Sequence, residues 1–336
     1  MNEPSKIKRG VDLELQIESL AYGGMGLARK DDFVIFVKGG IPGQKVNARI
    51  YKKKKGYAEA RVQHVLKESP NAVEAPCNHF GTCGGCKIQN LSYEEQLKEK
   101  TQQVEDAFRR LGGFLDFKLD NVVGADPIFH YRNKMEFTFS PHRWVLDTEP
   151  EDVDKSFAVG LHIPGRYDKI LDINKCHIQP ELGNKILNVA REVCLAHPEL
   201  KPYDSKTHIG FLRFLMLRFG VNTNQLMVNL VTAYDDINKL SPLIDALLDQ
   251  VPEITSMVNN VNTRKADVAF GEFETLVFGE PYIQETIGDL IFEISANSFF
   301  QTNTTQGKHL YDEIVKAAGL TGSEIVFDLY CGTGTI

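Results

Sequence analysis

The stretch FLRFLMLRFGVNTNQLMVNLVTA, residues 211–233, decides the fold class of the larger part of the chain. It holds two apolar runs on either side of the turn-favouring residues 221–224, and this arrangement predicts a β-hairpin. Apolar residues also recur every three or four positions at 182–193 and at 243–248, as they do on the buried face of a helix. The region 125–290 is therefore predicted to be a mixed α/β domain.

Residues 1–66 are predicted to form a separate, small β-barrel of the oligonucleotide-binding kind, because short alternating runs are separated by glycine-rich turns. Residues 1–61 hold 13 Lys and Arg against 7 Asp and Glu, whereas the remainder holds 25 against 38. Four lysines stand together in this segment: Lys52, Lys53, Lys54 and Lys55. A local excess of cations favours a surface that binds nucleic acid, and a merely solvated lysine-rich surface is the equal alternative.

Three of the six cysteines, Cys77, Cys83 and Cys86, fall within ten residues. In a chain that begins without a secretion signal, such crowding is typical of a metal site rather than of disulfides. Cys176 and Cys194 are the candidates for a fourth ligand, and the polar surroundings of Cys176 favour it over the helical Cys194. Three clustered ligands and one remote ligand favour a four-iron cluster over zinc, whose sites usually consist of two tight pairs.

The motif DLYCGTGTI, residues 328–336, follows the apolar run EIVF. It predicts a buried strand that leads into a loop at Gly332 and Gly334, where the backbone can approach a nucleotide-like ligand. The third glycine of a dinucleotide-binding motif is missing, so S-adenosylmethionine is favoured as the ligand. Cys331 lies inside this loop and is assigned a structural role.

Two further segments contain candidate contacts to RNA. The segment NSFFQTN, residues 297–303, places two aromatic rings beside amide side chains just before a predicted helix at 304–319. Such rings are suited to stacking on a flipped base, and core packing is the alternative. Arg132 and Lys134 lie in the alternating stretch HYRNKMEFTFS, where one strand face would present both cations to phosphates, with a solvated face as the alternative.

The cysteine run with CGGCKIQN, the distant DINKCHIQP, the segment SFFQTN and the motif DLYCGTGTI follow one another in this chain. In this order they resemble the bacterial RNA 5-methyluridine methyltransferases, those acting on 23S ribosomal RNA in particular. The resemblance covers essentially the whole chain. It implies three parts: a TRAM-like, RNA-binding barrel (1–66), a central α+β iron–sulfur domain (67–90 and 125–290) and the start of a Rossmann-like methyltransferase domain (91–124 and 291–336). The helix of the last part is expected to begin at SYEEQ, where Ser92 and Glu95 have the spacing of a capping box.

The resemblance also implies the bound groups and their contacts. A [4Fe–4S] cluster would be held by four thiolates: Cys77, Cys83, Cys86 and Cys176. S-adenosylmethionine would be contacted by Gln301, Tyr330 and Thr335 in addition to the two loop glycines, and Phe299 would stack on the target base. The RNA is expected to be 23S ribosomal RNA, with tRNA as the alternative. The polar N-terminus and the lack of a long apolar run predict a cytoplasmic protein without membrane contact, which we expect to be monomeric.

In the family that the chain resembles, a cysteine thiolate adds to uracil C6, C5 accepts the methyl group, and a carboxylate removes the C5 proton. These catalytic residues lie beyond the glycine loop in that family, so the 336-residue chain alone is expected to be inactive. The alternative is a non-catalytic RNA-binding protein with a structural metal cluster. A radical methylthiotransferase is disfavoured because it needs Cys-x3-Cys-x2-Cys, whereas five residues separate Cys77 from Cys83.

Overall fold

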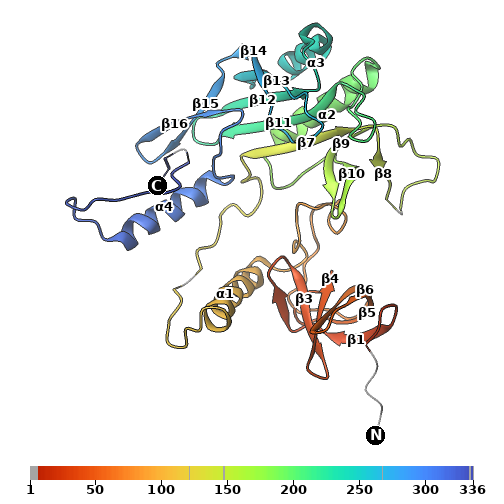
Figure 1. The fold of residues 1–336 in the computed structure, drawn as a ribbon, viewed down its shortest axis with the longest axis vertical. Coiled ribbons are helices and arrows are strands. Elements are labelled where there is room, and N and C mark those ends of the chain that lie inside the picture. The colour runs from red at the N-terminus through yellow and green to blue at the C-terminus, as the bar shows by residue number, and fades with distance from the viewer. Residues whose placement is uncertain (1–6, 121, 147, 267, 333, 336) are drawn as a thin grey trace. The chain divides into compact units, whose positions relative to one another are not determined.

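The computed structural model describes residues 7–120, 122–146, 148–266, 268–332 and 334–335. The chain divides into two compact units, Met1–Gly124 and Ala125–Ile336, and Figure 1 shows the elements of each. Among the described residues, no helix is both long enough and apolar enough to cross a membrane.

The first unit is built on a six-stranded sheet in the order β1-β5-β6-β4-β3-β2. Its strands are β1 (Asp12–Gln16), β2 (Ser19–Ala21), β3 (Met25–Lys30), β4 (Phe33–Lys38), β5 (Lys45–Lys53) and β6 (Tyr57–Lys67). Neighbouring strands are antiparallel except for β4 and β6, which are parallel. Alternate residues such as Leu13, Ile35 and Ile50 point into one core, as the period of two in the sequence requires. The predicted β-unit is confirmed.

Helix α1 (Tyr93–Arg110) packs with this sheet. The Glu99 carboxylate accepts a hydrogen bond of 2.6 Å from the amide of Leu20, and the side chain of Gln103 donates to the Leu20 carbonyl oxygen. The helix starts after Ser92 as expected, but the capping box is wrong, because the Ser92 side chain makes no cap hydrogen bond. By contacts, α1 belongs to the first unit; its grouping with a methyltransferase domain stays a prediction.

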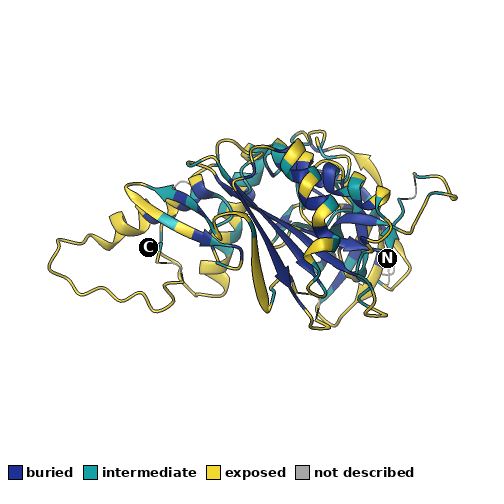
Figure 2. Ribbon diagram, turned by 90° about the horizontal axis from the view of Figure 1, so that it is seen from above, coloured by how far each residue is buried: buried dark blue, intermediate teal, exposed yellow. Residues whose placement is uncertain are grey.

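The second unit contains an eight-stranded mixed sheet in the order β14-β13-β12-β11-β7-β9-β10-β8. Its strands are β7 (Lys134–Ser140), β8 (Arg143–Trp144), β9 (Ala158–Ile163), β10 (Arg166–Asp172), β11 (Leu212–Gly220), β12 (Gln225–Thr232), β13 (Ser256–Val261) and β14 (Phe273–Gly279). The predicted hairpin is formed by β11 and β12, which pair from Leu212 with Thr232 to Gly220 with Gln225. Both strands are buried along almost their whole length (Figure 2).

Helices α2 (Glu181–Ala196) and α3 (Ile237–Gln250) contact each other and bury the predicted apolar stripes. Ile186 in α2 and Leu243 and Leu247 in α3 are fully buried. A parallel pair such as β12 and β13 needs a crossover connection, and α3 supplies it. The mixed α/β prediction for this region is therefore confirmed.

A second hairpin, β15 (Tyr282–Ile287) and β16 (Leu290–Ser295), is followed by α4 (Thr304–Ala318), which confirms the predicted C-terminal helix. The buried strand predicted at 324–330 is wrong: these residues form no strand, and Phe327 is 81% exposed. A strand needs a neighbour for its backbone hydrogen bonds, and none of the described strands pairs with this segment. Thr333 and Ile336 of the same motif lie outside the described residues.

Replacing Phe137 by alanine should destabilise the second unit. The ring lies in β7 opposite Leu215 of β11 and is fully buried, so its loss leaves a cavity that costs about 3–5 kcal/mol of unfolding free energy. Phe273→Ala is the matched control, because that ring is 67% exposed on the edge strand β14. Urea unfolding can be followed by the fluorescence of Trp144, the single tryptophan, which lies in β8 of this unit. Equal losses in the two variants would contradict the prediction.

Candidate functional site

The segment 296–304, which connects β16 to α4, contains the predicted contacts to cofactor and base. Arg218 of β11 holds its beginning: Nε donates to the Ala296 carbonyl oxygen at 3.1 Å, and a second guanidinium nitrogen donates to that of Ser298. Arg218 is almost fully buried. Burial lowers the pKa of Arg218 to about 10, against the opposing effect of Glu136, so the group stays charged at neutral pH.

Asn133 holds the other end of this segment. Its side-chain amide donates to the Gln301 carbonyl oxygen at 2.8 Å and to Thr304 Oγ1 at 2.9 Å, and its backbone N–H donates to the Thr302 carbonyl oxygen. The backbone of Gln301 is thereby fixed, which limits the directions in which its side chain can point. A fixed backbone of this kind is what a contact to a cofactor requires.

Glu285 completes the network from β15. Its carboxylate is fully buried and accepts hydrogen bonds from Thr304 Oγ1 at 3.0 Å and from the amides of Val221 and Asn222 at 2.7 and 3.0 Å. The turn of the β11–β12 hairpin is thus linked through one carboxylate to the start of α4.

The aromatic pair in this segment is divided between core and surface. Phe300 is buried and packs against Phe292 with ring centroids 6.0 Å apart, whereas Phe299 is 69% exposed. Of the two rings, Phe300 packs in the core, and Phe299 does not. The exposed ring of Phe299 is available for stacking, and its role on the target base stays a prediction.

The two asparagines of the segment have structural roles. Asn303 is the N-cap of α4 and accepts a hydrogen bond of 3.1 Å from the amide of Gln306. Asn297 donates to Asn260 of β13 at 3.2 Å. Among the amides of this segment, Gln301 is left as the candidate cofactor contact.

Gly332 and Gly334 lie in an exposed segment and both have positive φ angles. Gly332 and Gly334 have φ values of 55° and 72°, and the Gly334 amide donates to the Cys331 carbonyl oxygen at 2.7 Å. Tyr330 is 96% exposed, and Thr335 is half-buried. The contacts of this loop to S-adenosylmethionine stay predictions.

The alternation expected at 130–134 is wrong, because β7 begins only at Lys134. The preceding backbone pairs elsewhere: the amides of His130 and Arg132 donate to His177 and Ile178. Arg132 Nε donates to the Lys134 carbonyl oxygen, and Lys134 Nζ forms a 2.5 Å ion pair with Glu136. The two cations therefore do not share a strand face, and their contact with phosphates stays a prediction.

The cysteine-rich loop belongs to the first unit, and none of the six cysteines forms a disulfide. Burial raises the pKa of the Cys83 thiol, and the charges of Cys86 and Cys77 raise this pKa further. The Gly85 amide, 3.3 Å from the Cys83 sulfur, acts in the opposite direction. An amide directed at sulfur stabilises a thiolate, and the role of the three loop cysteines as ligands stays a prediction.

The fourth predicted ligand, Cys176, lies in the second unit and is buried. Asn184 of α2 fixes its backbone, accepting from the Cys176 amide at 2.8 Å. Among the described residues, no three or more His, Cys, Asp or Glu side chains are grouped so as to hold a metal. The donor chemistry fits a cluster, and the four-ligand set stays a prediction.

Arg218 and Glu285 are functional candidates that the sequence predictions missed. Arg218 bonds to Ala296, 78 positions away, and Glu285 bonds to Val221, 64 positions away. Such separations are beyond the range of any local sequence pattern. One signal was present: Arg213 and Arg218 interrupt the apolar run of β11, and a cation inside a buried strand needs dedicated acceptors.

Alkylation should distinguish Cys194 from Cys331. Burial raises the pKa of Cys194 to about 12, so roughly one molecule in 10,000 carries the reactive thiolate at pH 8. Cys331 is exposed and should react with iodoacetamide under the same conditions. Peptide mass spectrometry of native and urea-unfolded protein measures both sites. If Cys194 reacts as fast in the native protein as in urea, its burial is contradicted.

The comparisons with known proteins agree with this architecture. Residues 6–63 match the TRAM domain family. The chain is 43% identical to an uncharacterized RNA methyltransferase of Chlorobaculum tepidum, over 98% of this chain and 70% of that protein. A second uncharacterized RNA methyltransferase, from Porphyromonas gingivalis, is 40% identical over 96% of this chain and 70% of its own length.

A solved structure shows the same fold. The Pyrococcus abyssi tRNA (uracil-54, C5)-methyltransferase, in complex with S-adenosyl-L-homocysteine, matches with a TM-score of 0.69 and 27% identity, over 96% of this chain and 68% of that one. Together these matches define a class of RNA methyltransferases with an N-terminal TRAM domain. The chain belongs to this RNA methyltransferase family. The family predicted from the cysteine, SFFQTN and glycine-loop motifs is confirmed at this level.

Proposed function

We propose that this RNA methyltransferase uses S-adenosylmethionine to methylate C5 of uridine in RNA. One observation carries the proposal: the fold matches the Pyrococcus tRNA (uracil-54, C5)-methyltransferase bound to S-adenosyl-L-homocysteine along 96% of the chain. The motif order also resembles enzymes acting on 23S ribosomal RNA, which is the expected substrate here, with tRNA as the alternative.

The chain's own residues would mainly bind and orient the reactants. Arg218 and Asn133 hold both ends of the segment that carries Gln301 and Phe299, so a cofactor contact and a stacking ring share one rigid support. S-adenosylmethionine supplies an activated methyl group when it is bound. Tyr330, Thr335 and the two loop glycines would complete its contacts.

The nucleophile is not among the cysteines of this chain. Cys194 is buried with a pKa of about 12, Cys331 lies in the glycine loop, and the other four are the proposed cluster ligands. We therefore expect the 336 residues alone to be inactive.

Loss of the gene tests the proposed function. Ribosomal RNA and tRNA from a strain of the source organism with the gene disrupted should be digested and analysed by mass spectrometry for 5-methyluridine. We expect one 5-methyluridine to disappear from 23S ribosomal RNA and to return when the gene is restored. Loss from tRNA would establish the alternative substrate. Unchanged 5-methyluridine in both RNAs would overturn the proposal and favour the non-catalytic RNA-binding protein.

Iron analysis tests the proposed cluster. Protein purified without oxygen should contain about four iron and four sulfide per chain and absorb visible light. Cys83→Ser and Cys176→Ser should remove most of the iron, because each replaces a proposed thiolate ligand. Cys194→Ser is the matched control and should retain it, since that thiol is buried in α2. Full iron content in Cys176→Ser would exclude that residue as a ligand, and zinc in place of iron would show the other metal.

A further inference from the structure

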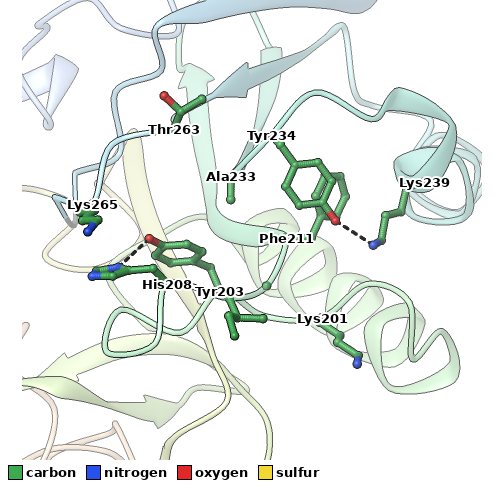
Figure 3. A pocket seen from close by; sticks show the side chains of 11 residues that line it. Lys201, Tyr203, His208, Phe211, Ala233, Tyr234, Lys239, Thr263 and Lys265 are labelled. Carbon is green, nitrogen blue, oxygen red and sulfur yellow. Dashed lines mark hydrogen bonds between the residues drawn. The ribbon is translucent and has the colours of Figure 1, made fainter.

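The second unit has a pocket that the proposed function does not use. Its volume is about 480 Å³, within the range of roughly 300–1,000 Å³ that is typical of ligand-binding pockets. It is lined by residues from the loop before β11, the end of β12, the start of α3 and the segment after β13 (Figure 3). The residues are Lys201, Tyr203, His208, Ile209, Gly210, Phe211, Ala233, Tyr234, Lys239, Thr263 and Lys265.

This pocket is separate from the Gln301 segment. It lies where β11 begins, whereas Asn133 pairs with Phe219 close to the end of that strand. The eight steps from Phe211 to Phe219 extend for roughly 26 Å at the rise of a β-strand. A ligand of nucleotide size cannot occupy both places at once.

The lining is strongly cationic. Lys201, Lys239 and Lys265 contribute ammonium groups, and none of the described residues that line the pocket has a carboxylate. Among the carboxylates of neighbouring segments, Glu272 accepts from Thr263 and Arg264, and Asp204 pairs with His142. Glu199 pairs with His197 and also acts electrostatically on Lys239. Among the described residues, the lining itself therefore presents three ammonium groups and no carboxylate to a ligand, and Lys239 is the one of the three that interacts with Glu199.

Two aromatic faces lie between these cations. Lys239 Nζ donates to the Tyr234 hydroxyl at 2.9 Å, and the Tyr234 ring packs on Phe211 with centroids 4.8 Å apart. On the other side of Ala233, the Tyr203 hydroxyl lies 2.9 Å from His208 Nδ1 (Figure 3). Tyr234 is 42% exposed, so its ring can accept a stacking partner.

The loop that carries Tyr203 and His208 is closed by its own backbone. The Asp204 amide donates to the Ile209 carbonyl oxygen at 2.8 Å, and the His208 amide donates to that of Asp204 at 2.7 Å. His208 has a φ of 60°, and a Cβ at Gly210 would lie 2.2 Å from the Pro202 carbonyl oxygen. Such backbone conformations persist only where the surroundings enforce them, so this side of the pocket is preorganised.

We propose that this pocket binds a nucleotide of single-stranded RNA away from the target uridine, an inference that rests on the proposed RNA function. Tyr234 stacks on the base, and Lys201, Lys239 and Lys265 contact the flanking phosphates. Unpaired bases stack on aromatic side chains in most single-stranded RNA sites, and lysines that follow the backbone add a salt-dependent attraction.

Binding of a fluorescein-labelled, mixed-sequence single-stranded RNA to the 336-residue chain tests this site. Lys265→Glu should weaken binding about tenfold and lower the salt slope by about 0.7, the value for one phosphate contact on a single strand. Tyr234→Ala should weaken binding about fivefold or more, and Tyr234→Phe should restore most of it because the ring is kept. Lys185→Glu makes the same charge change on the exposed face near the start of α2 and should keep the wild-type affinity within about twofold.

A photo-crosslink places the contact without any variant. RNA containing 4-thiouridine should crosslink to peptides spanning 201–211 or 233–239. Unchanged affinity in both Lys265→Glu and Tyr234→Ala, with no crosslink in these peptides, would overturn the inference. If Lys53→Ala/Lys54→Ala/Lys55→Ala still weakened binding in that case, the proposed RNA function would stand. A wild-type chain without affinity for RNA would overturn the inference and the RNA-binding part of the proposed function together.

Discussion

The carboxylate of Glu285 is fully buried, and the second unit depends on how it is satisfied. Among the described residues no cation forms an ion pair with it; the amides of Val221, Asn222 and Thr286 and the Thr304 hydroxyl supply its hydrogen bonds. A buried charge without such donors costs several kcal/mol, so the turn and the start of α4 must adopt the geometry that provides them. Asn133 extends the same network to Gln301. The hydrogen bonds that satisfy the buried Glu285 carboxylate therefore also help to fix the backbone of the candidate site at Gln301.

This dependence explains which parts of the structure the sequence could predict. Local patterns of neighbouring residues predicted several elements correctly: the hairpin at 211–233, the apolar stripes of α2 and α3, and the start of α4. The network was not predicted, because Asn133 and Thr304 are 171 positions apart. For the same reason the split between Phe299 and Phe300 could not be foreseen. Adjacent aromatics give no indication of which ring faces the core until a partner such as Phe292 is placed beside it.

Two segments of the predicted methyltransferase part, α1 and residues 324–330, show that an apolar pattern does not by itself determine what is buried. In α1, Val104 and Phe108 are apolar residues at helical spacing, yet they are 45% and 44% exposed, while Glu99 is buried. At 324–330, an apolar run has no strand beside it. The spacing of apolar residues indicates which face of an element can be buried, but that face is buried only if another helix or strand packs against it. A polar residue can take the inner position where it finds a donor, as Glu99 does at the Leu20 amide.

Net charge misleads about RNA binding for a related reason. The chain carries −7, yet cations collect in the N-terminal segment and around the pocket beside β11. At physiological ionic strength, charges further apart than about 8 Å are largely screened from one another. A phosphate in the pocket therefore responds to the charged groups nearest to it, and hardly to acids elsewhere in the chain. Affinity for a polyanion follows from such local groupings, because each phosphate that a group of cations contacts releases counterions whatever the net charge of the chain.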